Sequence, residues 1–339
     1  MIKVGIIGAN GFLGLELLRI LSIHPKVSLQ KILKRENDID DEFTHLSSLN
    51  LTELQTSNLD DFHNLDCVFL SLPHGSAEEY VKELIGKVKI IDLSSDYRIN
   101  DAQSYERYYK SSFDANLQNK FTYGFIEAKI DEIKNSENVA NPGCFALASQ
   151  LAIYPFEELI NNISITAITG SSGGGKAPTS KNHHSVRSKD VFSYNVNQHR
   201  HLAEIYQSFP SLTDNLSFVP LSGPYTRGIY VTAHIQSKEN IDLDKLNELL
   251  ENKYSNMPFV RIQSQNKLSN VVGSNYCDIS ISVKDNQNFV VEACIDNLIK
   301  GASGNAVECM NLMFSEDQSL GLKEMLPLYL WAKLNLFIN

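Results

Sequence analysis

The sequence has little of what marks secreted, membrane-spanning or nucleic-acid-binding proteins. Its five cysteines in 339 residues show no spacing typical of a disulfide framework or a zinc site. No apolar run is long enough to cross a bilayer, and the chain enters an apolar strand at once, which leaves no room for a signal peptide. A net charge of −10 argues against nucleic acid or an anionic membrane as a partner. We therefore expect a cytoplasmic protein.

The length and composition predict an ordinary globular protein with two domains. A chain of 339 residues exceeds one typical hydrophobic core, so two domains are expected. Hydrophobic residues make up 42% and charged residues 21%, as in ordinary globular proteins. Neither an internal repeat nor a low-complexity linker separates the two halves.

The first segment combines a strand, a glycine turn and a helix. Residues 2–7 form the apolar run of a parallel strand, residues 8–14 have the glycine spacing GxxGxxG, and residues 15–21 have helical periodicity. Glycine lets the backbone approach a pyrophosphate, and a helix N-terminus binds the anion. This order predicts a dinucleotide site, although a glycine turn without a ligand has the same pattern. The expected cofactor contacts come from Gly8, Asn10, Gly11, Phe12 and Leu13.

The end of the next expected strand bears on which dinucleotide binds. This strand covers about residues 28–33 and is followed by Lys34 and Arg35 instead of an acidic residue. An acidic residue there would bind the ribose 2′-hydroxyl of NAD, whereas Lys34 and Arg35 offer charge-assisted bonds to a 2′-phosphate. NADP is therefore favoured, with a solvated basic pair as the alternative.

Residues 139–148 predict a strand, a tight Asn-Pro-Gly turn, and Cys144 on the first turn of a helix. The positive end of the helix dipole and the unpaired backbone N–H groups there favour the nucleophilic thiolate. A small apolar residue closing a strand-to-helix joint is the alternative. The other four cysteines lie in strand-like or helical apolar runs, where each is expected to be a buried small hydrophobe.

The segment Gly170–Lys176 is nearly a Walker A motif and raises the alternative of a P-loop NTPase. The residue after the lysine is Ala177, which has no hydroxyl for Mg²⁺, and Pro178 restricts Ala177 away from helical angles. A glycine loop that touches phosphate or cofactor is favoured instead.

Four of the nine histidines lie within nineteen residues, at positions 183, 184, 199 and 201. A metal site is one interpretation, but no cysteine accompanies them and the familiar helical ligand spacings are missing. Acid–base chemistry is favoured because imidazole titrates near neutrality. Tyr194, Glu204 and Arg200 are candidate orienting or anion-binding groups near the pair His199 and His201.

Two further strands, residues 67–72 and 88–94, end in small or polar residues. Ligands bind at such carboxyl ends in a doubly wound sheet, so Arg98 is a candidate for holding a substrate anion, with a surface salt bridge as the alternative. Residues 100–136 lack clear periodicity and are expected to form a long excursion before the strand that leads to Cys144.

The second half has a different architecture. Alternating strands are expected at residues 164–169, 216–220, 228–235, 277–283 and 289–295, with a helix at 242–253. This predicts a mixed or antiparallel sheet with one face covered. The expected fold is α/β: a Rossmann-type parallel-sheet dinucleotide-binding domain (residues 1–144 plus about 300–339) and an α+β catalytic and dimerisation domain with a mixed sheet (residues 145–299). Cys144 would then lie at the junction.

A nicotinamide site, a thiolate and an acid–base histidine together define a reaction class. The thiolate displaces a leaving group from an acyl carbon to give a thioester, and hydride transfer followed by collapse releases an aldehyde. In that direction the activated acyl donor is an acyl phosphate. Donors in the turn near Cys144 could stabilise the oxyanion.

A resemblance to a known family extends over nearly the whole chain. The segments that carry it are 8–14, 92–98, 123–127, 141–144, 199–205, 224–229 and 296–302. Their Pro-Gly-Cys, His-Arg-His and Asp-Asn-Leu-x-Lys-Gly-Ala motifs, in this order, are specific. The chain resembles the N-acetyl-gamma-glutamyl-phosphate reductases, a family related to the aspartate-semialdehyde dehydrogenases. The resemblance implies NADPH-dependent reduction of N-acetyl-gamma-glutamyl phosphate to the semialdehyde, with release of phosphate, in arginine biosynthesis.

The resemblance also implies roles for residues. Cys144 would be the nucleophile, and His201, in preference to His199, the acid–base. Further implied cofactor contacts are Ser171, Gly174, Asn297 and Asn305. Arg227 joins Arg98 and Arg200 as a candidate substrate ligand, and members of the family are homo-oligomers, so a homodimer or homotetramer is expected.

Two departures from the family pattern concern the substrate. Phe145-Ala146 stands where Tyr-Pro commonly follows the cysteine, and residues 183–188 are similar to a subgroup that includes reductases of amino-adipyl phosphate, in lysine synthesis, and of other N-acyl-glutamyl phosphates. Reduction of N-succinyl-glutamyl phosphate or amino-adipyl phosphate is therefore an alternative activity. A non-catalytic NADP-binding regulator is a third hypothesis.

Overall fold

The computed structural model describes residues 1–33, 54–56, 58–110, 114–176 and 184–328. Within these ranges the chain divides into two compact units. Unit 1 comprises Met1–Ala102, Ser111–Pro142 and Ala302–Lys323, and unit 2 comprises Gln103–Lys110, Gly143–Gly301 and Glu324–Asn339, each as far as the described residues reach. The chain thus passes from unit 1 to unit 2 between Pro142 and Gly143, and residues 103–110 and 324–328 group with unit 2.

Unit 1 is built on a six-stranded sheet with the order β2-β1-β3-β4-β6-β5, in which all neighbouring strands are parallel. The strands are β1 Ile2–Ile7, β2 Val27–Leu33, β3 Cys67–Leu70, β4 Lys89–Asp92, β5 Thr122–Tyr123 and β6 Asn138–Ala140. Strand order reverses at β1, which pairs with β2 on one side and β3 on the other, as in doubly wound dinucleotide-binding domains. The predicted Rossmann-type architecture is confirmed.

The helices of unit 1 are α1 Phe12–Ser22, α3 Glu78–Leu84, α5 Ala115–Gln118, α6 Ile126–Lys134 and α11 Gly304–Met313, with the short 3₁₀ turn η2 Leu59–Phe62. Residues 100–136 are therefore more regular than the sequence predicted. The excursion holds α4 (Ala102–Tyr109), α5 and α6 together with β5. Helices of four to nine residues, one with a kink at Lys129, are too short for periodicity to identify them.

The backbone conformation and close packing of the turn between β1 and α1 require glycine at two positions. Gly8 has φ +83°, and a β-carbon there would meet the backbone of Ser71. A β-carbon on Gly14 would lie 2.6 Å from the Ala9 carbonyl oxygen. Gly11 is the N-cap of α1 and provides no side-chain cap, so the first N–H groups of this helix are left for other partners.

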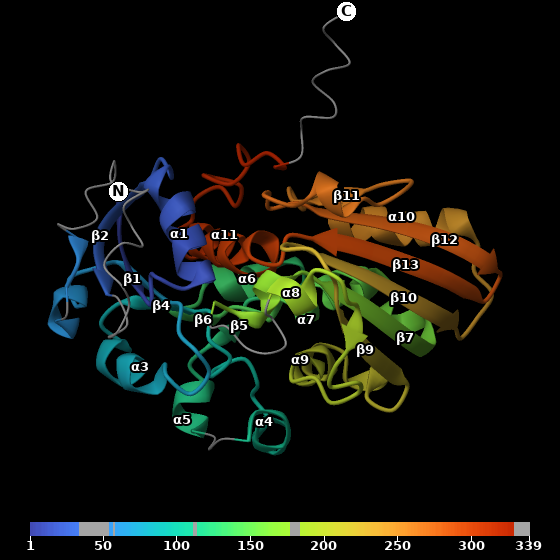
Figure 1. Ribbon diagram of the computed structural model, residues 1–339, viewed down its shortest axis with the longest axis horizontal. Coiled ribbons are helices and arrows are strands. Elements are labelled where there is room, and N and C mark those ends of the chain that lie inside the picture. Colours follow the sequence, from blue (N-terminus) through green and yellow to red (C-terminus); the bar gives the residue numbers. More distant parts are fainter. Residues whose placement is uncertain (34–53, 57, 111–113, 177–183, 329–339) are drawn as a thin grey trace, which may run out of the picture. The chain divides into compact units, whose positions relative to one another are not determined.

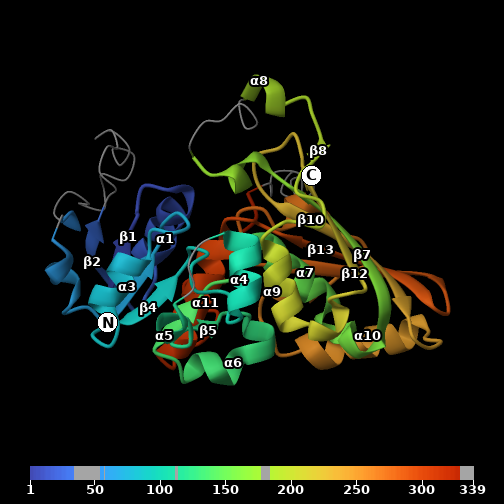
Figure 2. The same cartoon turned by 90° about the horizontal axis from the view of Figure 1, so that it is seen from below.

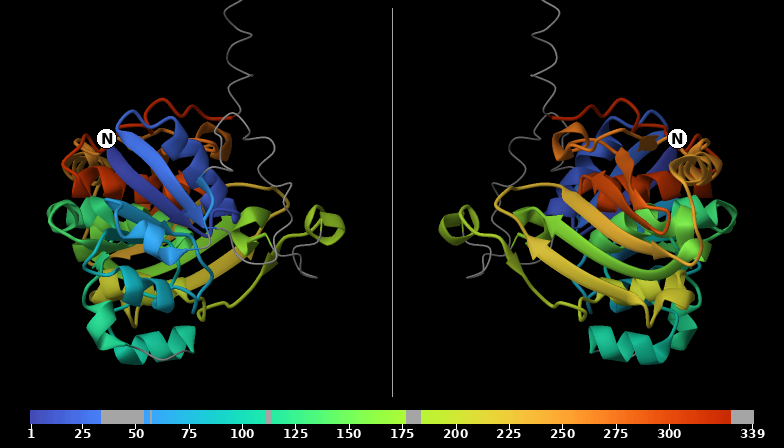
Figure 3. Two further views of the ribbon diagram at one scale, coloured as in Figure 1. Left: turned by 90° about the vertical axis from the view of Figure 1, so that its left-hand side faces the viewer. Right: turned by 90° about the vertical axis from the view of Figure 1, so that its right-hand side faces the viewer.

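Unit 2 contains a seven-stranded sheet with the order β11-β12-β13-β10-β7-β9-β8. The pairs β11–β12 and β7–β9 are parallel and the other pairs antiparallel, so the predicted mixed sheet is confirmed. The strands, which can be followed in Figure 3, are β7 Ile160–Thr169, β8 Phe192–Ser193, β9 Leu216–Ser222, β10 Ile229–Ser237, β11 Val260–Ile262, β12 Cys277–Asp285 and β13 Asn288–Ile295.

One face of this sheet packs against helices. In β10 every second residue is buried, as alternation in a half-covered sheet requires. The helix α7 (Cys144–Ile153) contacts β7, β10 and β13, and α10 (Leu243–Tyr254) contacts β11 and β12. The Tyr254 hydroxyl donates to the Leu151 carbonyl (2.6 Å), which joins α10 to α7. α9 (His201–Ser208) lies beside α7 (Figure 2), and the remaining helical segments of unit 2 include η3 Tyr154–Leu159, η4 Ser171–Gly174 and α8 His184–Arg187.

Substitution of Gly8 tests the packing of the glycine turn. Gly8→Ala is expected to lower the free energy of unfolding by about 2–5 kcal/mol, because it adds a clash with the Ser71 backbone to the strain of a positive φ. Gly86→Ala is the matched control: Gly86 has φ +79° and open space around its β-position, so strain alone costs about 1–2 kcal/mol. Urea unfolding followed by circular dichroism measures both, and equal losses would contradict the clash.

Candidate active site

Cys144 is the first residue of α7, as predicted. Gly143 is the N-cap and contributes no side chain, so the helix begins directly at the thiol. Cys144 is half-buried, whereas the other four cysteines are buried, which confirms the expectation for them. Burial strongly raises the pKa of the Cys67 and Cys294 thiols, so these two stay protonated.

A buried carboxylate joins the turn before Cys144 to the histidine pair. The Gly143 amide donates to Glu204 Oε2 at 2.8 Å, and Glu204 Oε1 lies 3.9 Å from His201 Nε2. A β-carbon at position 143 would lie 2.7 Å from Glu204 Oε1 and 2.6 Å from His201 Cε1. Only glycine therefore allows this close approach. The arrangement brings Cys144, His201 and Glu204 together in unit 2.

Further contacts fix α7 against α9. The Gln150 side-chain amide donates to the Glu204 carbonyl (3.1 Å) and to Ser208 Oγ (2.8 Å). The ring of Phe145 packs edge-on against His199, with centroids 5.4 Å apart, and against His201 at 6.2 Å. The phenylalanine that departs from the family pattern thus supports both imidazoles.

A second glycine lets the chain after β13 approach the thiol. A β-carbon on Gly301 would lie 2.9 Å from the Cys144 β-carbon. Gly301 belongs to a short π-helical turn, η7 Ile299–Ser303, of a kind frequent at functional sites.

His199 differs from His201 in its electrostatics. Burial and, secondarily, the neighbouring charge of Arg200 lower the pKa of His199 to about 4. The His201 amide donates to His199 Nδ1 at 3.2 Å, so a neutral His199 carries its proton on Nε2. His199 is therefore a neutral imidazole near pH 7, which makes it a poor general acid.

A cavity of about 810 Å³ in unit 2 opens beside these histidines. Its walls include His199, Arg200 and Tyr194, the carboxyl ends of β7 and β9, and the C-terminal part of α4. Burial raises the pKa of Tyr194. The Tyr194 ring packs edge-on against His199, with centroids 5.7 Å apart, so the cavity lies directly beside the histidine pair. The other lining residues are Arg107, Tyr108, Lys110, Thr169, Gly173, Gly174, Arg187, Phe192, Asn195, Asn197, Gln198 and Ser222.

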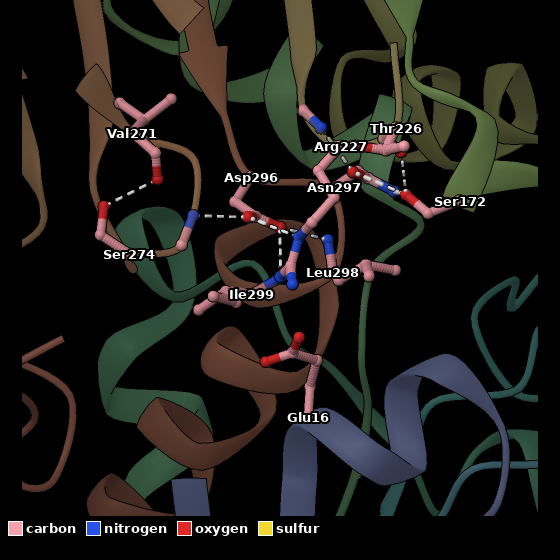
Figure 4. A network of polar contacts seen from close by, with 12 residues as sticks. Glu16, Ser172, Thr226, Arg227, Val271, Ser274, Asp296, Asn297, Leu298 and Ile299 are labelled. Carbon is pink, nitrogen blue, oxygen red and sulfur yellow. Dashed lines mark hydrogen bonds and ion pairs between the residues drawn. The ribbon is translucent and has the colours of Figure 1, made fainter. Parts of the chain in front are cut away.

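Arg227 and Asn297 belong to a network centred on the buried carboxylate of Asp296 (Figure 4). Arg227 donates through Nε (3.1 Å) and through its terminal nitrogen (3.2 Å) to the two carboxylate oxygens of Asp296. The amides of Gly273, Leu298 and Ile299 also donate to Asp296. The guanidinium of Arg227 is therefore held by the fold, and its substrate contact stays a prediction.

Asn297 ties two loops of unit 2 together. Its Oδ1 accepts from the Gly228 amide at 2.7 Å, and its Nδ2 donates to Ser172 Oγ at 3.0 Å (Figure 4). Ser172 Oγ in turn donates to the Thr226 carbonyl at 2.7 Å. Asn297 thus positions the loop that holds the predicted cofactor contacts Ser171 and Gly174.

The glycine loop after β7 does not have the geometry of a P-loop. A P-loop points its backbone N–H groups at phosphate. Here the amides of Ser171 and Ser172 donate to the carbonyls of Tyr225 (2.8 Å) and Thr226 (3.0 Å), and those of Gly173 and Gly175 donate within the loop. The NTPase hypothesis is not supported by this loop. Ala177, Pro178 and His183 lie outside the described residues.

The predicted residues of unit 1 gather at the carboxyl ends of its strands. Gly8, Asn10, Gly11, Phe12 and Leu13 form the β1–α1 turn. Arg98 is buried and donates to the Leu93 carbonyl at 3.1 Å, beyond the end of β4. Asn305 is buried at the start of α11, where its Nδ2 donates to the Gly124 carbonyl (3.0 Å) and to Asn141 Oδ1 (2.9 Å). Lys34 and Arg35 lie outside the described residues.

Two buried aspartates occupy the same edge of the sheet. Asp96 accepts from His74 Nδ1 (2.6 Å) and from the amides of Gly75 and Ala77, which shapes the loop after β3. Burial and the neighbouring Asp96 raise the pKa of Asp92 to about 7, against the hydrogen bonds from Ser94. Neither aspartate had a role assigned from the sequence.

Among the described residues, the three groups that could jointly ligate a metal ion are Asp60, His63 and Glu83, none of which belongs to the histidine cluster. No helix in the described part of the chain combines the length and apolar character that a bilayer crossing needs.

Comparisons with known proteins assign the chain to a family. Residues 3–136 match the NAD-binding domain of semialdehyde dehydrogenases, and residues 144–297 match the dimerisation domain of the same enzymes. The chain is 40% identical over 336 residues to an N-acetyl-gamma-glutamyl-phosphate reductase of Methanosarcina barkeri, covering 95% of this chain and 98% of the relative. It belongs to the N-acetyl-gamma-glutamyl-phosphate reductase family. The chain is thus an oxidoreductase.

Other relatives agree. The reductase of Archaeoglobus fulgidus is 37% identical, with 95% of this chain and 98% of the relative covered, and that of Halothermothrix orenii is 36% identical, with 96% and 99% covered. Among solved structures, aspartate semialdehyde dehydrogenase II from Vibrio cholerae matches with a TM-score of 0.69 at 16% identity, covering 93% of this chain and 98% of that one. At this identity the likeness shows only that the chain shares the fold of that enzyme.

Most residues that line the cavity were not singled out from the sequence as site residues, among them Thr169, Ser222 and Arg187. Thr169 and Ser222 end the strands β7 and β9, at positions that carry no motif. Only the pairing of these strands, which sequence periodicity does not determine, brings them together.

The His199 ring is expected to stay neutral through pH 5 and to titrate near pH 4. Because this folded-state pKa lies below the unfolded value of about 6.5, protonation favours the unfolded chain. The penalty starts below about pH 6.5 and grows to roughly 3 kcal/mol below pH 4. Ring NMR shifts, assigned with His199→Gln, measure the titration. A His199 resonance that titrates near pH 6.5 would contradict the electrostatics described above.

Proposed function

We propose that the chain reduces N-acetyl-gamma-glutamyl phosphate to N-acetyl-glutamate semialdehyde with NADPH, releasing phosphate, as a step of arginine biosynthesis. The observation that carries the proposal is the grouping of Cys144, His201 and Glu204 at the start of α7. The reductase relatives, at 36–40% identity, support the choice of substrate.

Cys144 is the proposed nucleophile. The positive end of the α7 dipole favours the thiolate, and its sulfur attacks the acyl carbon of the substrate. Phosphate leaves with the bonding electron pair, and a thioester of Cys144 remains. The Gly143 amide already donates to Glu204, so the amides that follow it in the first turn are the proposed donors to the oxyanion.

His201 is the proposed acid–base. The carboxylate of Glu204 stabilises the imidazolium form, which the neutral His199 does not offer. His201 gives its proton to the oxygen of the thiohemiacetal, or takes it back as that intermediate collapses to aldehyde and thiolate. Glu204 acts through His201 and the Gly143 amide and is therefore a positioning residue.

The β1–α1 turn of unit 1 fits a dinucleotide. Gly8 with its positive φ and the uncapped N-terminus of α1 leave backbone N–H groups for a pyrophosphate. The match to an NAD-binding domain supports this use of the turn. NADPH, when bound, supplies the hydride that reduces the thioester. We assign the 2′-phosphate to Lys34 and Arg35 on their charge.

A homodimer or homotetramer is the proposed assembly. Residues 144–297 match a dimerisation domain, and the face of the seven-stranded sheet away from α7 carries partly exposed residues on β7, β9 and β10.

Turnover of three acyl phosphates tests the substrate. The protein should oxidise NADPH fastest with N-acetyl-gamma-glutamyl phosphate, compared side by side with N-succinyl-glutamyl and amino-adipyl phosphates. A preference for either of the other two would transfer the assignment to that substrate.

Cys144→Ser is expected to lower kcat by at least about a thousandfold, because an alcohol at this position is a far weaker nucleophile than a thiolate. Cys67→Ala removes a buried thiol from β3 of unit 1 and should keep the kcat of the wild type. The fall in NADPH absorbance during turnover measures kcat for both variants. Full turnover by Cys144→Ser would refute the mechanism, whereas no turnover by the wild-type protein would favour the regulator hypothesis.

Glu204→Gln keeps a hydrogen-bond acceptor for the Gly143 amide but removes the charge beside His201. We expect kcat to fall about 10- to 100-fold with a smaller change in KM, and the pH–rate limb of the protonated imidazole to move to lower pH. Glu251→Gln, on the exposed face of α10, is the control. An unchanged pH profile with reduced kcat would assign Glu204 a structural role only.

A further inference from the structure

Arg187 is a buried cation without a counter-charge among the described residues. It is 8% exposed and lines the cavity of unit 2. Among the described residues it donates a long hydrogen bond from Nε to the Gly223 carbonyl (3.4 Å), and its guanidinium lies 5.7 Å from the ring centroid of Phe192. Burial lowers the pKa of Arg187, and the groups that oppose this shift are the phenols of Tyr194 and Tyr225, not a carboxylate. A buried charge normally has a partner, so an anion is expected here.

Two buried hydroxyls line the same cavity. Thr169 is 3% exposed and Ser222 is 1% exposed, and they face each other in register at the ends of β7 and β9. Within the described part of the chain, neither Thr169 Oγ1 nor Ser222 Oγ has a hydrogen-bond partner. Buried hydroxyls are nearly always hydrogen-bonded in folded proteins, so these two have donors to offer a ligand.

A glycine packs closely against one of these hydroxyls. A β-carbon on Gly173 would lie 3.1 Å from Thr169 Oγ1, tighter than ordinary contact. Gly173 also lines the cavity, so a larger residue at this position would crowd the Thr169 hydroxyl.

We propose that Arg187, Thr169 and Ser222 form a carboxylate subsite that holds the α-carboxylate of the acyl-phosphate substrate. The inference rests on the proposed function. A planar guanidinium matches a carboxylate with paired hydrogen bonds, and a single positive charge balances its single negative charge. The two hydroxyls donate to the lone pairs that remain on the carboxylate oxygens.

The position of the subsite suits a substrate that reacts at its other end. His199 and Tyr194 line the same cavity, and the His199 ring lies 4.6 Å from the ring of His201 and 5.4 Å from that of Phe145, the residue next to Cys144. The carboxylate and the reacting acyl carbon can therefore occupy one cavity. Exposed cations at its rim, Arg107, Lys110 and Arg200, attract an anionic substrate without fixing its orientation. We therefore assign recognition of the substrate's α-carboxylate to the buried residues Arg187, Thr169 and Ser222.

The test is calorimetric binding of two ligands that differ in one group. N-acetyl-L-glutamine carries the α-carboxylate and has a neutral amide at the reacting end; N-acetyl-L-glutamine α-amide lacks the charge. The full-length protein should bind the carboxylate about 10- to 100-fold more tightly than the amide. Arg187→Gln should abolish this preference.

Two variants that each remove one hydroxyl test the subsite even if Arg187→Gln does not fold. Thr169→Val and Ser222→Ala should each weaken binding of N-acetyl-L-glutamine by about 3- to 10-fold. Ser149→Ala is the matched control, because Ser149 on α7 is buried with its hydroxyl also unpartnered among the described residues, but it does not line the cavity. It should leave binding unchanged.

Several results would overturn the subsite. Equal affinity for the two ligands, no binding of either ligand, or a carboxylate preference that survives in all three variants excludes it. Displacement of N-acetyl-L-glutamine by equimolar inorganic phosphate would make the trio a phosphate site instead. The reaction is judged separately: Arg187-dependent binding of N-acetyl-L-glutamine without turnover of the acyl phosphate would refute the proposed function and leave the carboxylate subsite in place.

Discussion

The hydrogen bond from the Gly143 amide to the buried carboxylate of Glu204 is the contact on which the candidate active site depends. It attaches the turn that presents Cys144 to the helix that carries His201. A buried carboxylate needs such partners, and Gly143 and His201 provide them within one compact unit. The absence of a side chain at Gly143 is a requirement of this contact, because a β-carbon would meet both His201 and Glu204. The same bond removes the Gly143 amide from the donors available to a reacting oxygen.

Charged side chains are buried in two different ways in unit 2. The carboxylate of Asp296 is surrounded by a guanidinium and three backbone amides, so its charge is satisfied by the fold itself. Removing such a partner would leave an uncompensated buried charge, and this network therefore fixes the loops that carry Arg227 and Asn297. Arg187 lacks an equivalent among the described residues and faces a cavity. The contrast separates a guanidinium held by the fold from one that is suited to an anionic ligand.

Local patterns in the sequence were enough to predict the elements that present the site. The apolar run of residues 2–7 with its glycine turn, and the Asn-Pro-Gly turn before Cys144, depend on a few adjacent residues and were found where expected. The short helices between residues 100 and 136 were missed because none is long enough to show a period. Contacts between distant segments could not be predicted: Glu204 meets Gly143 across sixty-one positions, and Thr169 meets Ser222 through strand pairing. The ion pair of Arg227 with Asp296 could not be predicted for the same reason, since the two residues lie sixty-nine positions apart.

Mass spectrometry of the acylated protein tests most directly whether Cys144 forms the covalent intermediate. The full-length protein is mixed with N-acetyl-gamma-glutamyl phosphate without NADPH, quenched in acid and digested. We predict release of about one phosphate per chain and an acyl group on the peptide that contains Cys144, which hydroxylamine removes as it does a thioester. Phosphate release without an acyl group on Cys144, or an acyl group on another residue, would contradict it.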